Sequence, residues 1–218
     1  MGYGAVPGLR ERKKLATRQE LARAALRLAM ERGLDNVLVE DIAAAADVSP
    51  RTFNNYFANK YEAICSLGVE RAALIGDALR QRPAEEPLWE ALANAVIGHY
   101  EQGPLRDGPT IASLRMVMCS PQLRGEQHRT LGAMREALAS AIAERTAMSG
   151  AGAAGSVPSR EGTAPAAYEG LGAEVLAAAV LAAAHVAVRR WAAADPPVDL
   201  GQLIGTALAE LAGTLRGA

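Results

Sequence analysis

The chain has 218 residues, of which half are hydrophobic and only 4 % are aromatic, and its 23 basic and 24 acidic side chains nearly cancel. This length allows one large domain or two small ones with a real core, and the many Ala, Leu, Glu, Arg and Gln residues predict an all-α fold. Cys65 and Cys119 form no metal-binding or CxxC spacing, and the N-terminal residues show no secretion signal, so we expect a cytoplasmic protein with two reduced thiols.

The basic residues are concentrated at the N-terminal end. Residues 1–60 carry ten Lys/Arg against seven Asp/Glu, whereas the remainder is acidic. This asymmetry suggests a polyanion as the partner of the N-terminal part. Residues 1–14 are predicted to form a flexible basic arm. Its cations Arg10, Arg12, Lys13 and Lys14 either reach DNA phosphates or a minor groove, or belong to a solvated tail.

Four helices are predicted over residues 15–80. Thr17 and Glu20 match a capping box, and the apolar spacing behind them predicts a helix that ends at Gly33. A short helix over residues 39–46 and a tight turn at 47–48 follow. Ser49 caps a third helix that begins with Pro50, and a fourth helix, capped by Asn59, continues to about residue 80.

This order of a helix, a short helix, a turn and a Ser-Pro helix is typical of a helix-turn-helix motif, whose last helix enters the DNA major groove. Phe53 and Phe57 are four residues apart and can anchor that helix by one face. Arginine and asparagine suit base edges, and a phenol or an ammonium suits phosphates. The alternative is that the asparagines form an ordinary polar surface. The predicted DNA contacts are Lys13, Lys14, Thr17, Arg51, Thr52, Asn54, Asn55, Tyr56 and Lys60.

The segment GLDNVLVEDIAAAADVSPRTFNNYFANKYEAI resembles the N-terminal domain of the TetR family of transcriptional regulators, and the resemblance covers about residues 15–65. It depends on Gly33, Val39, Ile42, Ala43, Val48, Ser49, Thr52, Phe53, Tyr56, Phe57 and Lys60. It implies a homodimer with a DNA-binding domain over 15–65 and a helical regulatory and dimerisation domain over 66–218, whose ligand releases DNA. Family members usually carry a threonine pair where this chain has Val37-Leu38. Many also carry a tyrosine in place of Asn54, so we expect Asn54 to recognise bases.

Five helical segments are predicted beyond residue 85, over 88–101, 110–119, 123–148, 171–194 and 200–215, with a flexible loop over 149–170. The most apolar stretch, residues 175–188, is shorter than the roughly 18 residues that a membrane span requires, which favours a buried helix. By resemblance, the last two helices pair between subunits; the alternative is that they close the subunit's own core. The candidates for this dimer interface are Ala178, Ala182, Leu203, Leu208 and Leu211.

Large or soft apolar residues of this C-terminal part are candidates for an effector pocket, although each also suits an ordinary core. They are Trp89, Tyr100, Met116, Met118, Met134 and Trp191. The part also loosely resembles family members that sense fatty acyl thioesters. No catalytic, phosphate-loop or metal-binding motif occurs, so we expect neither an enzyme nor a cofactor. The sequence therefore predicts a dimeric repressor that binds a palindromic DNA operator and is released by a small apolar effector; the alternative is a helical interaction scaffold.

Overall fold

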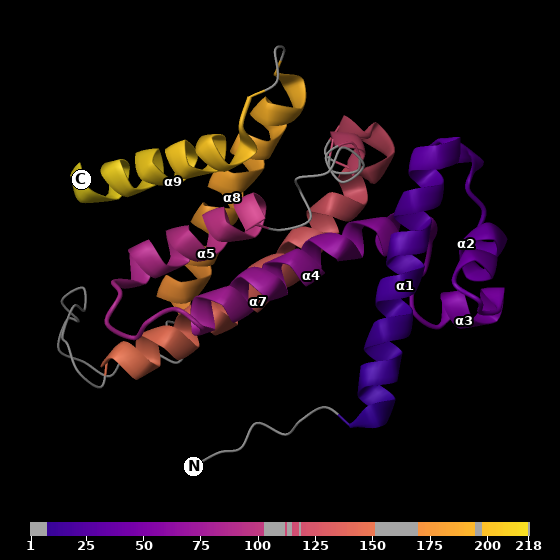
Figure 1. The fold of residues 1–218 in the computed structure, drawn as a ribbon, viewed down its shortest axis with the longest axis horizontal. Coiled ribbons are helices and arrows are strands. Elements are labelled where there is room, and N and C mark those ends of the chain that lie inside the picture. The colour runs from indigo at the N-terminus through magenta and orange to yellow at the C-terminus, as the bar shows by residue number, and fades with distance from the viewer. Residues whose placement is uncertain are drawn as a thin grey trace. The chain divides into compact units, whose positions relative to one another are not determined.

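The computed structural model describes residues 8–102, 112, 115–117, 119–150, 170–194 and 198–217. These residues form helices and turns without a strand, as the all-α prediction requires. The helices are α1 (Leu9–Arg32), α2 (Val39–Ala45), α3 (Pro50–Asn54), α4 (Lys60–Arg80), α5 (Leu88–Gln102), α7 (Arg124–Gly150), α8 (Leu171–Ala193) and α9 (Leu200–Gly217), with short 3₁₀ turns η1 (Leu34–Asn36) and η3 (Pro121–Leu123) (Figure 1).

The chain divides into two compact units, which we call the head and the body. The head comprises residues 1–67 and 120–127, and the body comprises residues 68–119 and 128–218. Helix α4 therefore begins in the head and continues in the body. The predicted helix over 110–119 and the predicted loop over 149–170 lie largely outside the described residues, while α7 extends to Gly150.

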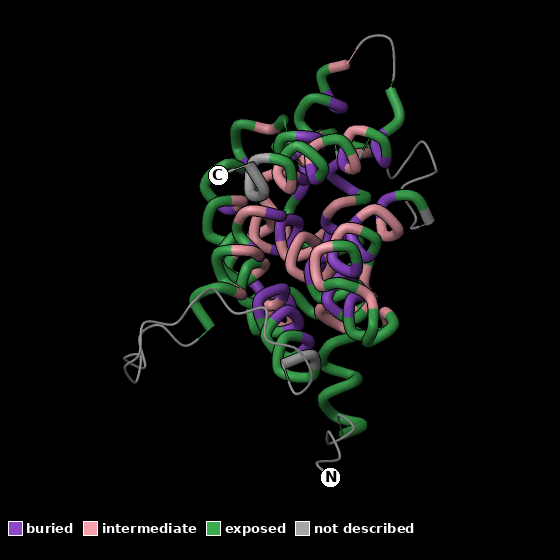
Figure 2. Tube along the Cα trace, turned by 90° about the vertical axis from the view of Figure 1, so that its left-hand side faces the viewer, coloured by how far each residue is buried: buried purple, intermediate pink, exposed green. Residues whose placement is uncertain are grey.

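Helix α1 begins at Leu9, well before the predicted start at Thr17, so residues 9–14 of the predicted flexible basic arm are helical. The physical reason is that no helix-breaking residue follows Gly8, and the residues 9–16 are nearly all good helix formers. Thr17 is not a cap, because its Oγ1 donates to the carbonyl oxygen of Lys13, 3.0 Å away, one turn earlier. These first turns of α1 are exposed (Figure 2).

The core of the head lies between α1, α2 and α3, and α2 contacts both of the others (Figure 1). Ile42, Phe53 and Phe57 are each at most 2 % exposed there. The predicted turn after α2 is confirmed: Asp47 has φ 52°, and the Val48 N–H donates to the carbonyl oxygen of Ala43 at 2.9 Å. This bond is one half of a Schellman motif, and it turns the chain sharply from α2 into α3.

The core of the body is formed by α5, α8 and α9 with parts of α4 and α7. Helix α9 contacts both α5 and α8. The connection from α4 to α5 is held by Arg145, which is 2 % exposed. Its guanidinium donates to the backbone carbonyl oxygens of Leu79, Arg82, Pro83 and Glu86. A buried cation thus binds one carbonyl of the last turn of α4 and three carbonyls of the connection that follows, which stabilises that turn.

Helix α8 is long and apolar enough to cross a membrane by length and composition alone. Its most apolar 18-residue window has a mean hydropathy of 2.0, and 28 % of that window is buried in the chain. The prediction of a buried helix is therefore only half right, since one face packs on the body and the other is exposed. The sequence could not locate the buried face, because alanines occupy both faces.

Candidate nucleic-acid interface

The start of α3 is fixed by the predicted Ser-Pro cap. The Thr52 N–H donates to Ser49 Oγ at 3.1 Å, and the two hydroxyls are hydrogen-bonded at 2.9 Å. Pro50 takes the first helical position, where its missing N–H breaks no hydrogen bond. The Thr52 hydroxyl is therefore engaged in the cap, which orients it for any further contact.

The inner face of α3 is anchored by two phenylalanines and by an arginine that the sequence analysis did not predict. The rings of Phe53 and Phe57 lie 5.7 Å apart in the core of the head. The guanidinium of Arg18 stacks 4.3 Å from the centroid of Phe57 and donates to the carbonyl oxygen of Tyr56 at 2.9 Å. Arg18 precedes the buried Leu21 by three residues, so its place on the inner face of α1 could have been inferred from the spacing.

The outer face of α3 presents three polar side chains. Arg51, Asn54 and Asn55 are exposed, whereas Tyr56 is half-buried. Within the described part of the chain, the side chains of Arg51, Asn54 and Asn55 make no hydrogen bond, so their donors and acceptors are available. A helix of this kind can place a guanidinium and two amides against the edges of base pairs.

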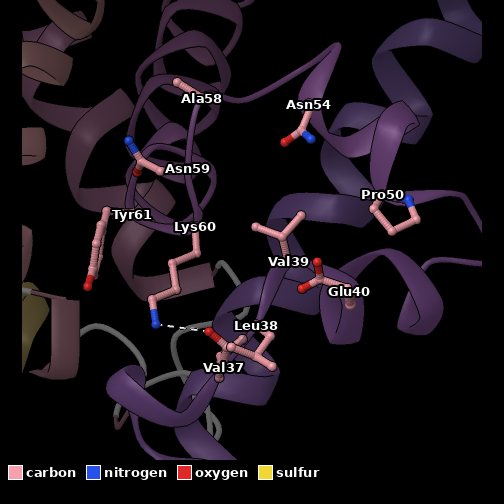
Figure 3. Close-up of a pocket in the computed structure, with 10 residues that line it drawn as sticks. All are labelled: Val37, Leu38, Val39, Glu40, Pro50, Asn54, Ala58, Asn59, Lys60 and Tyr61. Atoms are coloured by element: carbon pink, nitrogen blue, oxygen red, sulfur yellow. Dashed lines mark hydrogen bonds between the residues drawn. The ribbon is translucent and has the colours of Figure 1, made fainter.

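An open hollow of about 460 Å³ lies beside α3 (Figure 3). It is lined by Val37, Leu38, Val39, Glu40, Pro50, Asn54, Ala58, Asn59, Lys60 and Tyr61. Lys60 points at the backbone of the α1–α2 connection, where its Nζ donates to the carbonyl oxygens of Val37 at 2.9 Å and Asp35 at 3.4 Å. Lys60 therefore ties the start of α4 to the start of α2, and its contact with a phosphate stays a prediction.

The α2 N-terminus has only half of a capping box. The Leu38 N–H donates to Asp41 Oδ2 at 3.1 Å, but the leucine side chain has no oxygen to accept a hydrogen bond in return. Leu38 is 61 % exposed, whereas its neighbour Val37 is 1 % exposed. The departure from the family's threonine pair thus leaves an apolar side chain on the surface of the hollow.

The remaining predicted DNA contacts lie on α1. Lys13 and Lys14 are exposed on the helix, so they project from a defined rod instead of a flexible arm. Thr17 is half-buried, and its hydroxyl is used within α1.

The pocket candidates are distributed over the body. Tyr100 and Trp191 are buried in its core, and Trp89 packs against it. Met116 and Met134 are half-buried, while Met118 lies outside the described residues. The exposed Arg115 lies 5.6 Å from the ring of Trp191.

One dimer candidate is wrong. Leu208 is 1 % exposed within a single chain and belongs to the core of the body, so it cannot contact a partner. The apolar stripe of α9 is broad enough to serve its own core, which favours the alternative that this helix closes the subunit's own core. Ala178 and Ala182 are exposed on α8, and Leu203 and Leu211 are half-buried on α9.

Two family models match this chain. The model described as "Bacterial regulatory proteins, tetR family" matches residues 21–62, which include α2 and α3. The model described as "MftR C-terminal domain" matches residues 86–153. Together they cover about half of the chain.

A curated relative supports the same assignment. The HTH-type transcriptional regulator TcmR of Streptomyces glaucescens is 39 % identical over 146 residues, and the match spans 64 % of this chain and 64 % of that protein.

Solved structures share the fold at low identity. The chain is similar to Thermus thermophilus FadR, a TetR-family repressor in complex with lauroyl-CoA, with a TM-score of 0.54 and 20 % identity over 89 % of this chain and 92 % of that one. It is also similar to a TetR-family regulator of Syntrophomonas wolfei, with a TM-score of 0.61 and 17 % identity over 94 % of this chain and 97 % of that one. With its helix-turn-helix head and helical body, this chain belongs to the TetR family of transcriptional regulators.

Proposed function

We propose that this protein is a cytoplasmic transcriptional repressor that binds a palindromic DNA operator as a homodimer and is released by a small, largely apolar effector. The observation that carries the proposal is the outer face of α3, where Arg51, Asn54 and Asn55 are exposed and unbonded within the described residues. Each bidentate contact of such a side chain with the right base discriminates by about 1–3 kcal/mol, so a few contacts suffice for a specific site.

The dimer is supported by the outer face of α8. Leu171, Val175 and Val186 are 47 %, 59 % and 52 % exposed, and the exposed Ala178 and Ala182 continue the same stripe. An apolar stripe along a helix of 23 residues is costly in water unless another surface covers it. A second copy of α8 is our choice, because an operator requires two heads about one helical turn, roughly 34 Å, apart.

Dimerisation can be tested directly by light scattering after gel filtration. We expect Ala178→Glu together with Ala182→Glu to give monomers, because the carboxylates would face each other across the paired helices. The matched control is Ala173→Glu, a half-buried position of the same helix that packs on the chain's own body. Ala173→Glu should lower the free energy of unfolding but leave the mass measured by light scattering at that of the dimer. A wild-type monomer would contradict the dimer.

An apolar effector is supported by the composition of the body, whose aromatic and methionine residues suit an irregular apolar ligand. The lauroyl-CoA bound by Thermus thermophilus FadR gives one candidate class, a fatty acyl thioester. We carry this class to the present chain as a hypothesis about the effector, to be tested by release of operator DNA.

DNA recognition is tested with a labelled palindromic fragment from the protein's own promoter and a random fragment, at two salt concentrations. Asn54→Ala and Asn55→Ala should weaken the cognate fragment by about tenfold or more and leave the random fragment nearly unchanged. Gln81→Ala, which removes an exposed amide from the body, is the control. A scaffold protein would prefer neither fragment, and equal losses on both fragments would exclude a role of the asparagines in base recognition.

A further inference from the structure

A compact group of polar side chains lies where α4 and α5 meet in the body. The guanidinium of Arg71 is 5.9 Å from the centroid of the Tyr100 ring, and the ring of His99 meets Tyr100 edge-on at 5.5 Å. Tyr100 is 8 % exposed and belongs to the core, whereas Arg71 and His99 are half-buried. Tyr100 belongs to a core made mainly of Ala, Leu, Ile and Val, so a guanidinium and an imidazole against its ring are unusual there.

Arg71 has no acidic partner among the residues that the structure describes. It forms neither an ion pair nor a hydrogen bond there, and its contact with Tyr100 is the stacking one. The nearest acidic neighbour of Tyr100 along the chain, Glu101, lies instead against α9, since a Cβ on Gly201 would come within 3.1 Å of its Oε1. A half-buried guanidinium keeps five N–H donors, and an aromatic face satisfies none of them as hydrogen bonds.

His99 adds a neutral donor and acceptor to this cation. Burial, and secondly the charge of Arg71, lower the pKa of His99 to about 4, so the imidazole is uncharged at neutral pH. A neutral imidazole offers one N–H and one acceptor nitrogen. The cluster therefore combines one fixed positive charge with polar groups that do not repel it, within apolar surroundings.

We propose that Arg71, with His99 and Tyr100 beside it, binds the acidic head group of the effector, whose apolar part occupies the body. This inference rests on the proposed function, because it names the chemical class of the ligand that controls DNA binding. A carboxylate or a phosphate matches the donors of a guanidinium. In a partly desolvated site, the guanidinium binds such an anion far more strongly than it binds an uncharged hydroxyl. The effector is therefore an amphipathic anion.

The test measures binding of decanoate, decyl phosphate and 1-decanol to the full chain by calorimetry. We expect at least one acidic probe to bind about tenfold or more tightly than 1-decanol, and the better acid identifies the head group. Arg71→Met should abolish this preference while 1-decanol binding changes less than about twofold, and Arg71→Lys should restore part of it. Arg115→Met, which removes the exposed arginine beside Trp191, should leave the preference intact.

The inference is overturned if the wild-type protein binds neither acid more tightly than 1-decanol, or if Arg71→Met keeps the preference. Because Arg71→Lys keeps the charge and most of the stem, it separates loss of recognition from loss of folding. DNA binding is measured separately on the promoter fragment. A protein that binds its fragment specifically but ignores the acidic probes refutes this inference alone, whereas a protein that prefers the acids but not its fragment refutes the proposed function alone.

Discussion

The exposed Leu38 at the start of α2 allows a sharp test of how the head is built. Leu38 adopts the extended conformation of an N-cap, with φ −100° and ψ 158°, and its N–H already donates to Asp41 Oδ2. A threonine at this position fits the same backbone and adds the missing acceptor oxygen. Leu38→Thr should therefore complete the capping box.

The expected change in the free energy of unfolding follows from how far Leu38 and its neighbour Val37 are buried. Leu38 is 61 % exposed, so little apolar contact is lost, and the new cap should raise the free energy of unfolding by about 1 kcal/mol. Val37 is 1 % exposed, and Val37→Thr would place a hydroxyl in the core at a cost of about 1–3 kcal/mol. The same residue type at adjacent positions should thus act in opposite directions.

The assay is urea unfolding of both variants at one fixed protein concentration, because the proposed dimerisation would make the midpoint depend on concentration. For a slope of about 2 kcal/mol/M, the cap should raise the midpoint by about 0.5 M, and the buried hydroxyl should lower it by at least as much. Unchanged slopes would show that the denatured states are comparable. If Leu38→Thr gives no gain, or if both variants shift alike, the half-formed box is not what limits the α2 N-terminus.

The remaining predictions concern the body. Gly76→Ala should lower the free energy of unfolding by about 1 kcal/mol, because its Cβ would lie 3.1 Å from the rigid Cβ of Ala141. Gly68→Ala should raise the free energy of unfolding by up to about 1 kcal/mol, since the close contact of its Cβ is with the flexible thioether of Met134, and the Thr130 methyl lies at an ordinary 3.8 Å. Thermal unfolding of the two variants checks this. The pKa of Glu86 is lowered to about 2, mainly by hydrogen bonds from Arg82, so its stabilisation is complete above about pH 4.5 and is lost as the pH falls toward 2. Glu86→Gln should flatten the stability profile in that interval and leave its slope at neutral pH unchanged.

The sequence was sufficient where the structural signals are local. Ser49, Pro50, Phe53 and Asn59 each act within a few residues of their own position, and the structure confirms the cap, the helix start and the anchor that they predicted. The pattern failed at Leu208, because a broad apolar stripe does not reveal which surface covers it.

The long-range contacts of Arg145 left no signal in the sequence. Arg145 binds carbonyl oxygens about 60 residues away, and neither composition nor spacing marks it among the 23 basic residues of the chain. The case of Arg18 is intermediate: its spacing from Leu21 places it on the inner face of α1, but nothing local marks its partner carbonyl, which lies 38 residues away. Such contacts depend on tertiary geometry, which follows from the whole chain and not from any local pattern of residues.

The proposed recognition of DNA by α3 depends on the side chains that hold this helix in place. A helix of five residues is far too short to be stable alone, so its orientation is set by what packs against it. Arg18→Met keeps the apolar stem but removes the hydrogen bond to Tyr56 and the stacking on Phe57. We expect Arg18→Met to bind cognate DNA about tenfold more weakly than the wild-type protein does. The control is Arg27→Met, which removes an exposed charge from the same helix, and the two variants should bind random DNA equally well. If the two variants behave alike on both DNAs, Arg18 contributes only charge, and the orientation of α3 must be fixed by the phenylalanines alone.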